Sequence, residues 1–444
     1  MSGIMVTVIY QMQYMYLLLW CRRGSVMLSS NAISSERPRR GQAMSATKGS
    51  EVHFDPYAHE VHDDPYPYYA RLREHAPVYY NEEHGYWLLS KWDDCYEAFR
   101  DVDTFSSTAG PALEAQQDAN AGYPMFINMD PPDHTRIRKL IQSLMLPKRI
   151  YALEQYIRDK AISLITPHLE KGYMDLTQDF AALLPMDVIS TMIHVPEKDQ
   201  DTVRGWADDL IYREDGQFGL NERNINAYFN LGKYFDQLAT ELSEKLEGVD
   251  DIFSAVLQAE REGKLTHEDV IGFGILLAIA GNETTTKLIG NMCYRLWQHK
   301  DQRQMLLDDP SLMSKAVEET LRFDGSTQLI GRQVMKDVVI RGKTLKKGER
   351  VGLCIISASR DEDKYENPDS YDITRGSRDH MAFGKGIHSC IGANLARLEV
   401  QVCMEEILRL IPDYEIDEAG LKRTYNPNVR GFTHVPVTFT PKRG

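Results

Sequence analysis

One cysteine in the sequence stands among glycines at the point where the chain turns into a helix. Residues 383–392 read Phe-Gly-Lys-Gly-Ile-His-Ser-Cys-Ile-Gly, and an apolar helical pattern follows over residues 393–410. Unpaired backbone N–H groups at the start of this helix favour the thiolate form of Cys390, which is the form that binds a metal. Gly384 and Gly386 remove Cβ atoms where the loop must bend, and Gly392 allows a flat group to approach the helix. Cys390 is therefore a candidate metal ligand.

Two other interpretations of Cys390 are open. A cysteine is most often a small, buried, apolar side chain, and His388 with Cys390 could form half of a zinc site. The sequence has no second Cys/His pair at zinc spacing to complete such a site. The other cysteines also lack paired spacing, which is typical of reduced thiols in a cytoplasm: Cys21, Cys95, Cys293, Cys354 and Cys403. A net charge of −14 argues against a nucleic-acid partner.

A second candidate site lies in the middle of a long apolar helix predicted over residues 266–300. Thr266 can cap its start, and no charged residue occurs from residue 270 to 280. The polar insertion Ala-Gly-Asn-Glu-Thr-Thr-Thr then covers residues 280–286, and its hydroxyls can bond to carbonyls one turn earlier and open the helix. This opening could be a kink without chemistry. Alternatively, Gly281 makes room for a small ligand while Glu283 and Thr284 deliver protons to it.

Two further patterns combine charge with helical spacing. The sequence Asp130-Pro131-Pro132 predicts a helix start with Asp130 as the N-cap, which places His134 and Arg138 on one helix face. That face could be solvated, or it could bind the carboxylates of a cofactor. Glu319 and Arg322 lie one helical turn apart, and the default interpretation is a surface ion pair.

These patterns together resemble those of the cytochrome P-450 superfamily. Residues 383–392 match its signature Phe-Gly-x-Gly-x-His-x-Cys-x-Gly, residues 280–284 are similar to its oxygen-activation motif, and residues 319–322 to its Glu-x-x-Arg motif. The resemblance covers about residues 53–440 in the same order. It implies one mainly α-helical cytochrome P-450 fold with a smaller β region, which holds heme b between the central helix and the Cys390 loop.

The resemblance also implies residue roles. Cys390 would ligate the iron in a loop formed with Phe383, Gly384, Gly386 and Gly392. Glu283 and Thr284 would deliver protons beside Gly281, and Glu319 with Arg322 would form a buried brace. The candidates for binding the heme propionates are His134, Arg138, Arg332 and His388.

The implied reaction is insertion of one oxygen atom from O2 into an apolar small-molecule substrate. We expect no fused flavin or iron–sulfur domain, because residues 1–43 are too short and no cysteine cluster occurs, and we therefore expect a separate ferredoxin or flavodoxin-type electron donor with its reductase. Its docking candidates are Arg136, Lys139, Lys385 and Arg397. Two alternatives are a peroxide-driven heme-thiolate peroxygenase and a non-catalytic heme protein that binds or senses a ligand. The acid–alcohol pair argues against both.

The sequence also predicts how the chain is divided. We interpret residues 1–43 as a leader that is disordered or results from the choice of start site, with Met44 as the alternative start. Residues 44–444 would form the single catalytic domain. An anchor in residues 4–20 is conceivable, but polar residues interrupt this run. We expect a cytoplasmic monomer without membrane attachment.

Overall fold

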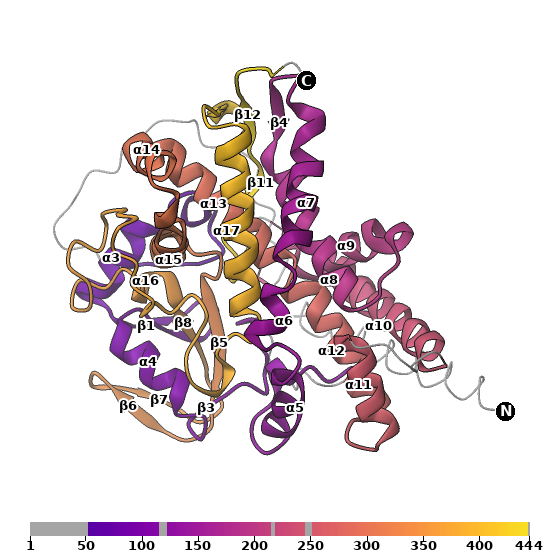
Figure 1. The fold of residues 1–444 in the computed structure, drawn as a ribbon. Helices are drawn as coiled ribbons and strands as arrows, with labels where there is room; N and C mark the ends of the chain where they lie inside the picture. The colour runs from indigo at the N-terminus through magenta and orange to yellow at the C-terminus, as the bar shows by residue number, and fades with distance from the viewer. Residues whose placement is uncertain (1–51, 115–121, 215–217, 245–250, 443–444) are drawn as a thin grey trace, which may run out of the picture. The chain divides into compact units, whose positions relative to one another are not determined.

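The described part of the chain is mainly helical (Figure 1). The computed structural model describes residues 52–114, 122–214, 218–244 and 251–442, so the expectations for residues 1–43 and Met44 lie outside it. Within these ranges no helix is long and apolar enough to cross a membrane. The α-helices are α2 (His59–Asp63), α3 (Tyr66–His75), α4 (Trp92–Arg100), α5 (Asp133–Gln142), α6 (Pro147–Tyr151), α7 (Glu154–Ile165), α8 (Leu184–Met192), α9 (Glu197–Ile211), α10 (Glu222–Ser243), α11 (Ile252–Arg261), α12 (His267–Ala280), α13 (Glu283–Gln298), α14 (Lys300–Asp308), α15 (Met313–Asp324), α16 (Ile355–Ala358) and α17 (Ala393–Leu410).

In the described ranges the strands form one five-stranded sheet and three smaller sheets. The large sheet has the order β1-β2-β8-β5-β3, in which β2 and β8 are parallel and the other neighbours antiparallel. Its strands are β1 (Val78–Asn81), β2 (Tyr86–Leu89), β3 (Phe105–Ser106), β5 (Leu329–Val334) and β8 (Arg350–Cys354). The smaller sheets are β6 (Val338–Ile340) with β7 (Lys343–Leu345), β10 (Lys422–Arg423) with β11 (Phe432–His434), and β4 (Tyr173–Asp175), β12 (Pro436–Thr438) and β9 (Glu415–Ile416).

The short helices complete the list of elements and mark several connections. They are η1 (Phe126–Asn128), η2 (Thr166–His168), the π-helix η3 (Leu176–Ala181), η4 (Pro310–Leu312), η5 (Gly386–His388) and η6 (Glu418–Gly420). Of these, η5 lies in the Cys390 loop and therefore bears on the candidate site.

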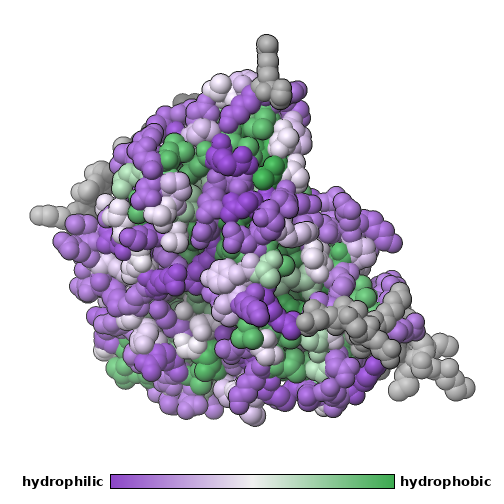
Figure 2. All heavy atoms as spheres, in the orientation of Figure 1, coloured by the Kyte–Doolittle hydropathy of each residue, from purple (hydrophilic) through white to green (hydrophobic). Residues whose placement is uncertain are grey.

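The core forms around three long helices. Residues 270–278 of α12 are all buried, as expected from a helical run without charge. Helix α13 follows α12 after a short break. Helix α17 packs against α7, α13 and α15. Figure 2 shows a surface on which hydrophilic residues predominate and apolar residues are scattered. The largest core cluster contains buried apolar residues of α12, α13 and α17 together with those of neighbouring helices.

Of the two helix starts predicted from capping residues, one is confirmed and one is wrong. Thr266 forms a capping box with Asp269: its Oγ1 accepts from the Asp269 N–H at 3.1 Å, and Asp269 Oδ2 accepts from the Thr266 N–H at 3.0 Å. Asp130 is not an N-cap, because α5 begins at Asp133 and the Asp130 carboxylate accepts from the Ser107 N–H instead. The strand β4 was not predicted, because its three residues form a strand by pairing with β12, which lies far along the chain.

Candidate functional site

The loop before α17 holds Cys390 in a fixed backbone conformation. The Cys390 N–H donates to the Phe383 carbonyl at 2.8 Å. Gly384 and Gly386 have φ angles of 63° and 69°, in the left-handed region that glycine adopts without strain. A Cβ on Gly386 would also lie 2.5 Å from the Phe99 carbonyl oxygen. Both glycines are therefore required for this loop, as their positions predicted.

Cys390 is exposed among the described cysteines, which are otherwise buried. The residue keeps accessible surface, although surrounding protein buries the thiol enough to raise its pKa. The Gly392 N–H, Arg138 and Arg397 lower this pKa but do not outweigh burial. The helix start alone therefore does not produce the thiolate that we expected. A metal cation at the sulfur would supply the missing positive charge.

The central helix opens where its sequence predicts. Helix α12 ends at Ala280 and α13 begins at Glu283, and the Thr284 hydroxyl donates to the Ala280 carbonyl at 2.8 Å. Ala280 is exposed although the preceding turns are buried, which indicates an open space beside the break. A Cβ on Gly281 would lie 2.5 Å from Ile189 Cδ1. The small size of Gly281 is thus required by packing against α8, whereas its contact with a cofactor stays a prediction.

The Glu283 carboxyl has two partners that the sequence did not reveal. The Lys287 ammonium lies 3.1 Å from Glu283 Oε2, and both side chains are at most 10% exposed. Asp208 on α9 is the second, because burial and the Glu283 carboxyl raise the pKa of Asp208. Lys287 could have been found from its i, i+4 spacing. Asp208 could not, because it lies on another helix far away in the chain.

Four basic side chains converge from three separate segments. His134 and Arg138 come from α5, Arg332 from β5 and His388 from η5, and the rings of His134 and His388 lie 4.1 Å apart between centroids. Burial lowers the pKa of His388 to about 2, with Arg332, His134 and Arg138 adding to the shift. Burial likewise lowers the pKa of His134 to about 4 and that of Arg332 to about 10.

This basic cluster has unused hydrogen-bonding capacity. Both ring nitrogens of His134 and Nε2 of His388 are buried without a hydrogen-bond partner among the described residues. Asp130 attracts His134 and Arg332, but its Oδ1 accepts a hydrogen bond from the Ser107 N–H. Buried nitrogen atoms without a hydrogen-bond partner destabilise a folded protein unless a ligand forms hydrogen bonds with them. The cluster therefore has the character of an anion site.

The Glu319–Arg322 pair is buried rather than on the surface. Both side chains are 0% exposed, and two hydrogen bonds of 2.8 and 2.7 Å join the guanidinium to the carboxylate. Arg375 lies 3.4 Å from Glu319 Oε2, and the Asp372 N–H donates to Oε1 at 3.0 Å. Arg375 was missed because nothing in its local sequence marks it as the partner of a distant helix.

A further buried carboxyl, on α17, was also missed. Glu399 is 1% exposed and hydrogen-bonds with Thr285 of α13. Burial raises the pKa of Glu399 well above its ordinary value, and its Oε1 has no partner among the described residues. Burial therefore favours the neutral form of the Glu399 carboxyl. It lies in the interface between the helix after Cys390 and the helix that carries Thr284.

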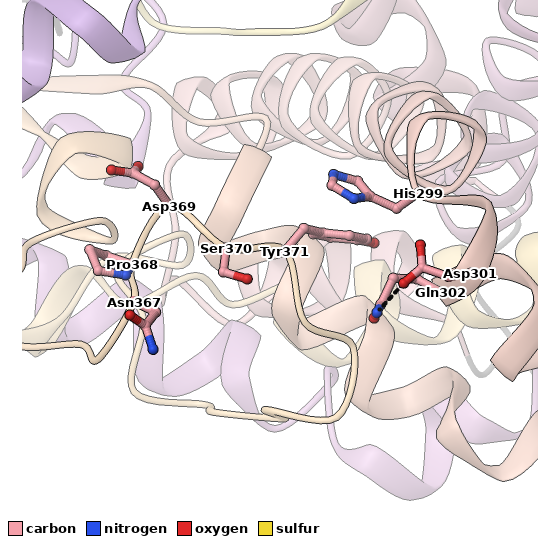
Figure 3. Close-up of a pocket in the computed structure, with 8 residues that line it drawn as sticks. All are labelled: His299, Asp301, Gln302, Asn367, Pro368, Asp369, Ser370 and Tyr371. Atoms are coloured by element: carbon pink, nitrogen blue, oxygen red, sulfur yellow. Dashed lines mark hydrogen bonds between the residues drawn. The ribbon is translucent and has the colours of Figure 1, made fainter.

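A shallow cleft of about 570 Å³ lies apart from these residues (Figure 3). It is lined by His299, Asp301, Gln302, Asn367, Pro368, Asp369, Ser370 and Tyr371. The Arg322 guanidinium donates to the carbonyls of Pro368 and Ser370, so this wall belongs to the brace. None of the candidate catalytic residues lines the cleft, and we assign the chemistry to the region of Cys390 and Glu283 instead.

The four candidate docking residues differ in whether their side chains are bonded within the chain. Arg397 binds Glu318 at 2.6 Å, Lys385 binds Asp379 at 3.1 Å, and Arg136 donates to the Lys264 carbonyl. Lys139 is exposed on α5. The charges of three candidates are thus partly offset within the chain, and Lys139 is the most available to a partner.

Comparison with known proteins gives the class. A family model described as Cytochrome P450 matches residues 230–412. The chain is 37% identical over 393 residues to a protein named Putative cytochrome P450 123 from Mycobacterium tuberculosis, covering 87% of this chain and 97% of that protein. The chain belongs to the cytochrome P450 family.

Further relatives support the same class and fold. A protein named Vitamin D(3) 25-hydroxylase from Pseudonocardia autotrophica is 36% identical over 407 residues, covering 89% of this chain and 98% of that protein. The structure of CYP109E1 from Bacillus megaterium in complex with testosterone has a TM-score of 0.78 at 32% identity, covering 86% and 99% of the two chains. The protein is therefore a heme-thiolate monooxygenase with the cytochrome P450 fold.

The residues present fit the heme that the family uses. The Cys390 residue is exposed and can bind a metal, and a buried basic cluster with unpaired nitrogens can accept carboxylates. Among the described residues no group of three or more His, Cys, Asp or Glu side chains could hold a metal ion.

Proposed function

We propose that this protein inserts one oxygen atom from O2 into an apolar small molecule, and that Glu283 and Thr284 deliver the protons consumed. The second oxygen atom leaves as water after uptake of two electrons and two protons. The observation that carries the proposal is the Thr284 hydroxyl, which bonds to Ala280 at a break in an otherwise buried helix. The buried carboxyl of Glu283 lies next to it in the chain.

Cys390 would hold the heme iron, and the basic cluster would hold the propionates. Phe383, Gly384, Gly386 and Gly392 shape the loop around the sulfur. When bound, heme supplies the oxidising chemistry, which electron donation by the thiolate promotes. The chain binds and orients the substrate, excludes water and moves protons. The proposed propionate ligands are His134, Arg138, Arg332 and His388.

Sterol-type molecules are the first substrates to test. One relative is named for hydroxylation of vitamin D3, and a similar structure contains testosterone. Electrons would come from a separate ferredoxin or flavodoxin-type donor. Because Lys139 is exposed whereas Arg136, Lys385 and Arg397 have partners within the chain, we place the strongest docking contribution at Lys139.

The test of the reaction begins with spectra of the heme-loaded protein. The reduced carbon monoxide complex is expected to show the red-shifted thiolate band, and its absence would exclude Cys390 as the ligand. Sterols are then screened by the shift of the Soret band, and those that bind are assayed for product with O2 and reductant. Turnover with peroxide alone would favour a peroxygenase, and binding without product would favour a sensor.

The roles of individual residues are tested by matched pairs of variants. Thr284→Ala is expected to lower product formed per electron consumed, whereas Thr286→Ala is the control because its hydroxyl donates to the Ala181 carbonyl. Lys139→Glu is expected to slow electron transfer from the donor. Lys171→Glu is its control, since Lys171 is exposed beside β4, distant from α5 in Figure 1. Equal effects within either pair would refute the assignment.

A further inference from the structure

One buried carboxylate joins the two chain segments on either side of the Cys390 loop. Glu318 lies on α15, directly before Glu319 of the brace, and is 2% exposed. In the segment that enters the loop, the His380 ring nitrogen Nε2 lies 2.9 Å from Glu318 Oε2. On α17, which leaves the loop, the Arg397 guanidinium donates to Oε1 at 2.6 Å and to Oε2 at 3.1 Å. Glu318 therefore connects residues that precede and follow Cys390 in the sequence.

The hydrogen bonds around His380 fix its tautomer. Its Nδ1 accepts a hydrogen bond from the Ala382 N–H at 3.2 Å, so the ring proton is on Nε2 and is donated to the Glu318 carboxylate. Burial lowers the pKa of His380, which favours this neutral ring. Burial raises the pKa of Glu318, but the hydrogen bonds from His380 and Arg397 outweigh burial and lower this pKa to about 2. At pH 7 Glu318 is therefore a carboxylate with one neutral and one charged donor.

A third cation near this carboxylate is held less firmly. Arg378 lies 3.3 Å from Glu318 Oε1, but its side chain is 73% exposed, so water screens its charge. His380 is buried, and Arg397 forms two hydrogen bonds with the carboxylate. Hydrogen bonds to a buried, ionised acceptor are stronger than those of a surface ion pair. The firm contacts of Glu318 are therefore those with His380 and Arg397.

Both partners of Glu318 lie against Phe383, the first residue of the loop. The Arg397 guanidinium carbon lies 4.5 Å from the centroid of the Phe383 ring, and the centroid of the His380 ring lies 6.0 Å from it. The Phe383 carbonyl accepts the Cys390 N–H at 2.8 Å. A continuous series of contacts thus leads from Glu318, through its two partners and Phe383, to the backbone of Cys390.

We propose that Glu318 is a positioning residue that holds together the two sides of the Cys390 loop and so fixes the sulfur for the iron. This inference rests on the ligand role proposed for Cys390. Because one carboxylate accepts from both His380 and Arg397, its loss lets the two segments move relative to each other. The hydrogen bond between the Phe383 carbonyl and the Cys390 N–H then no longer has a fixed geometry.

The variant Glu318→Gln removes this connection with little change in side-chain size. The amide oxygen still accepts from one segment, but the amide nitrogen cannot accept from the other. The matched control is Glu406→Gln on α17. Glu406 is also a buried carboxylate held by two arginines, but its partners, Arg158 at 2.7 Å and Arg409 at 2.7 Å, belong to other segments. A general cost of removing a buried carboxylate appears in both variants.

A second pair of variants changes His380 and leaves Glu318 in place. A glutamine has an amide N–H that can replace the Nε2–H donor, so His380→Gln keeps the hydrogen bond to Glu318. The shorter side chain in His380→Asn can accept from the Ala382 N–H but does not reach Glu318. We expect His380→Asn to behave like Glu318→Gln, and His380→Gln to behave like the wild type. This pair decides the question if Glu318→Gln does not fold.

The first measurement is the rate at which Cys390 is alkylated in the heme-free protein, with the modified residue located by mass spectrometry. Glu318→Gln and His380→Asn are expected to react faster than the wild type, because the loop around the thiol is no longer held. Glu406→Gln and His380→Gln are expected to react at the wild-type rate. Equal rates in Glu318→Gln and Glu406→Gln, or in the two His380 variants, would overturn the proposal.

The second measurement is the rate at which the loaded proteins lose heme to a heme-free globin. Glu318→Gln and His380→Asn are expected to lose heme about tenfold faster than their controls, as is typical when the support of a metal ligand is removed. Their reduced carbon monoxide complexes should also lose the thiolate band sooner. Heme loss at the rate of the controls would overturn the proposal. If the wild type itself lacked the thiolate band, the proposed ligand role would fail, and the alkylation rates alone would decide whether Glu318 positions the loop.

Discussion

Removal of the Arg322 side chain is expected to destabilise the protein far more than its helical spacing suggests. The guanidinium is fully buried and forms two hydrogen bonds with Glu319 and one each with three backbone carbonyls. Arg322→Ala leaves the Glu319 carboxylate with Arg375 at 3.4 Å and one N–H donor. Breaking a buried ion pair costs about 3–5 kcal/mol. The carbonyls that lose their donor belong to Ser359, Pro368 and Ser370.

The assay is chemical unfolding of the heme-loaded protein, followed by circular dichroism and a second probe. The control is Asp201→Ala, because the Asp201–Arg204 pair has the same i, i+3 spacing but Asp201 is 87% exposed, and its loss should cost less than about 1 kcal/mol. The double variant Glu319→Ala/Arg322→Ala should lose less than the sum of the single losses, since no charge is left alone. A loss in Arg322→Ala no larger than that of the control would refute the reasoning.

Three other variants test buried contacts. Gly431→Ala should destabilise the protein by about 1–3 kcal/mol and displace Lys287, because the new Cβ would lie 2.4 Å from Lys287 Cβ; an unchanged unfolding midpoint would contradict this. The pKa of Glu399 is raised in the folded state, so above pH 4.5 the unfolded chain loses this proton first and the free energy of unfolding falls as pH rises. Glu399→Gln should remove up to ~1.4 kcal/mol per pH unit of this slope, and equal slopes for the two proteins would contradict it. Arg332→Leu should stabilise the heme-free protein while heme dissociates faster, and a less stable heme-free protein would count against the anion site.

The parts of the site predicted from sequence are those with local signals. A glycine-flanked cysteine before a helix, a capping box at Thr266 and a threonine that bonds back one turn each depend on neighbours within a few residues. Asp130 shows the limit of such signals, because its Asp-Pro-Pro sequence suggests a cap but Ser107, from a different segment, takes the carboxylate. Local chemistry names a donor or acceptor, whereas the fold selects its partner.

The residues that sequence reasoning missed are partners supplied from a distance. Asp208 reaches Glu283 only because α9 packs across α12, and Glu399 reaches Thr285 only because α17 packs on α13. Arg375 likewise comes from an irregular segment to the pair on α15. Each has an ionisable side chain, and such side chains are usually found on the surface. Their burial is visible only in three dimensions.

The two ends of the candidate site differ in how their charges are paired. At the basic cluster, cationic and imidazole groups gather with nitrogens left unpaired, which costs stability that an added anion can recover. At Glu283, the buried carboxyl already has a counter-ion, because the Lys287 ammonium lies 3.1 Å from its Oε2. The first arrangement therefore calls for a bound acid, whereas the second is balanced within the chain. This difference is the physical reason to expect the heme carboxylates at the basic cluster.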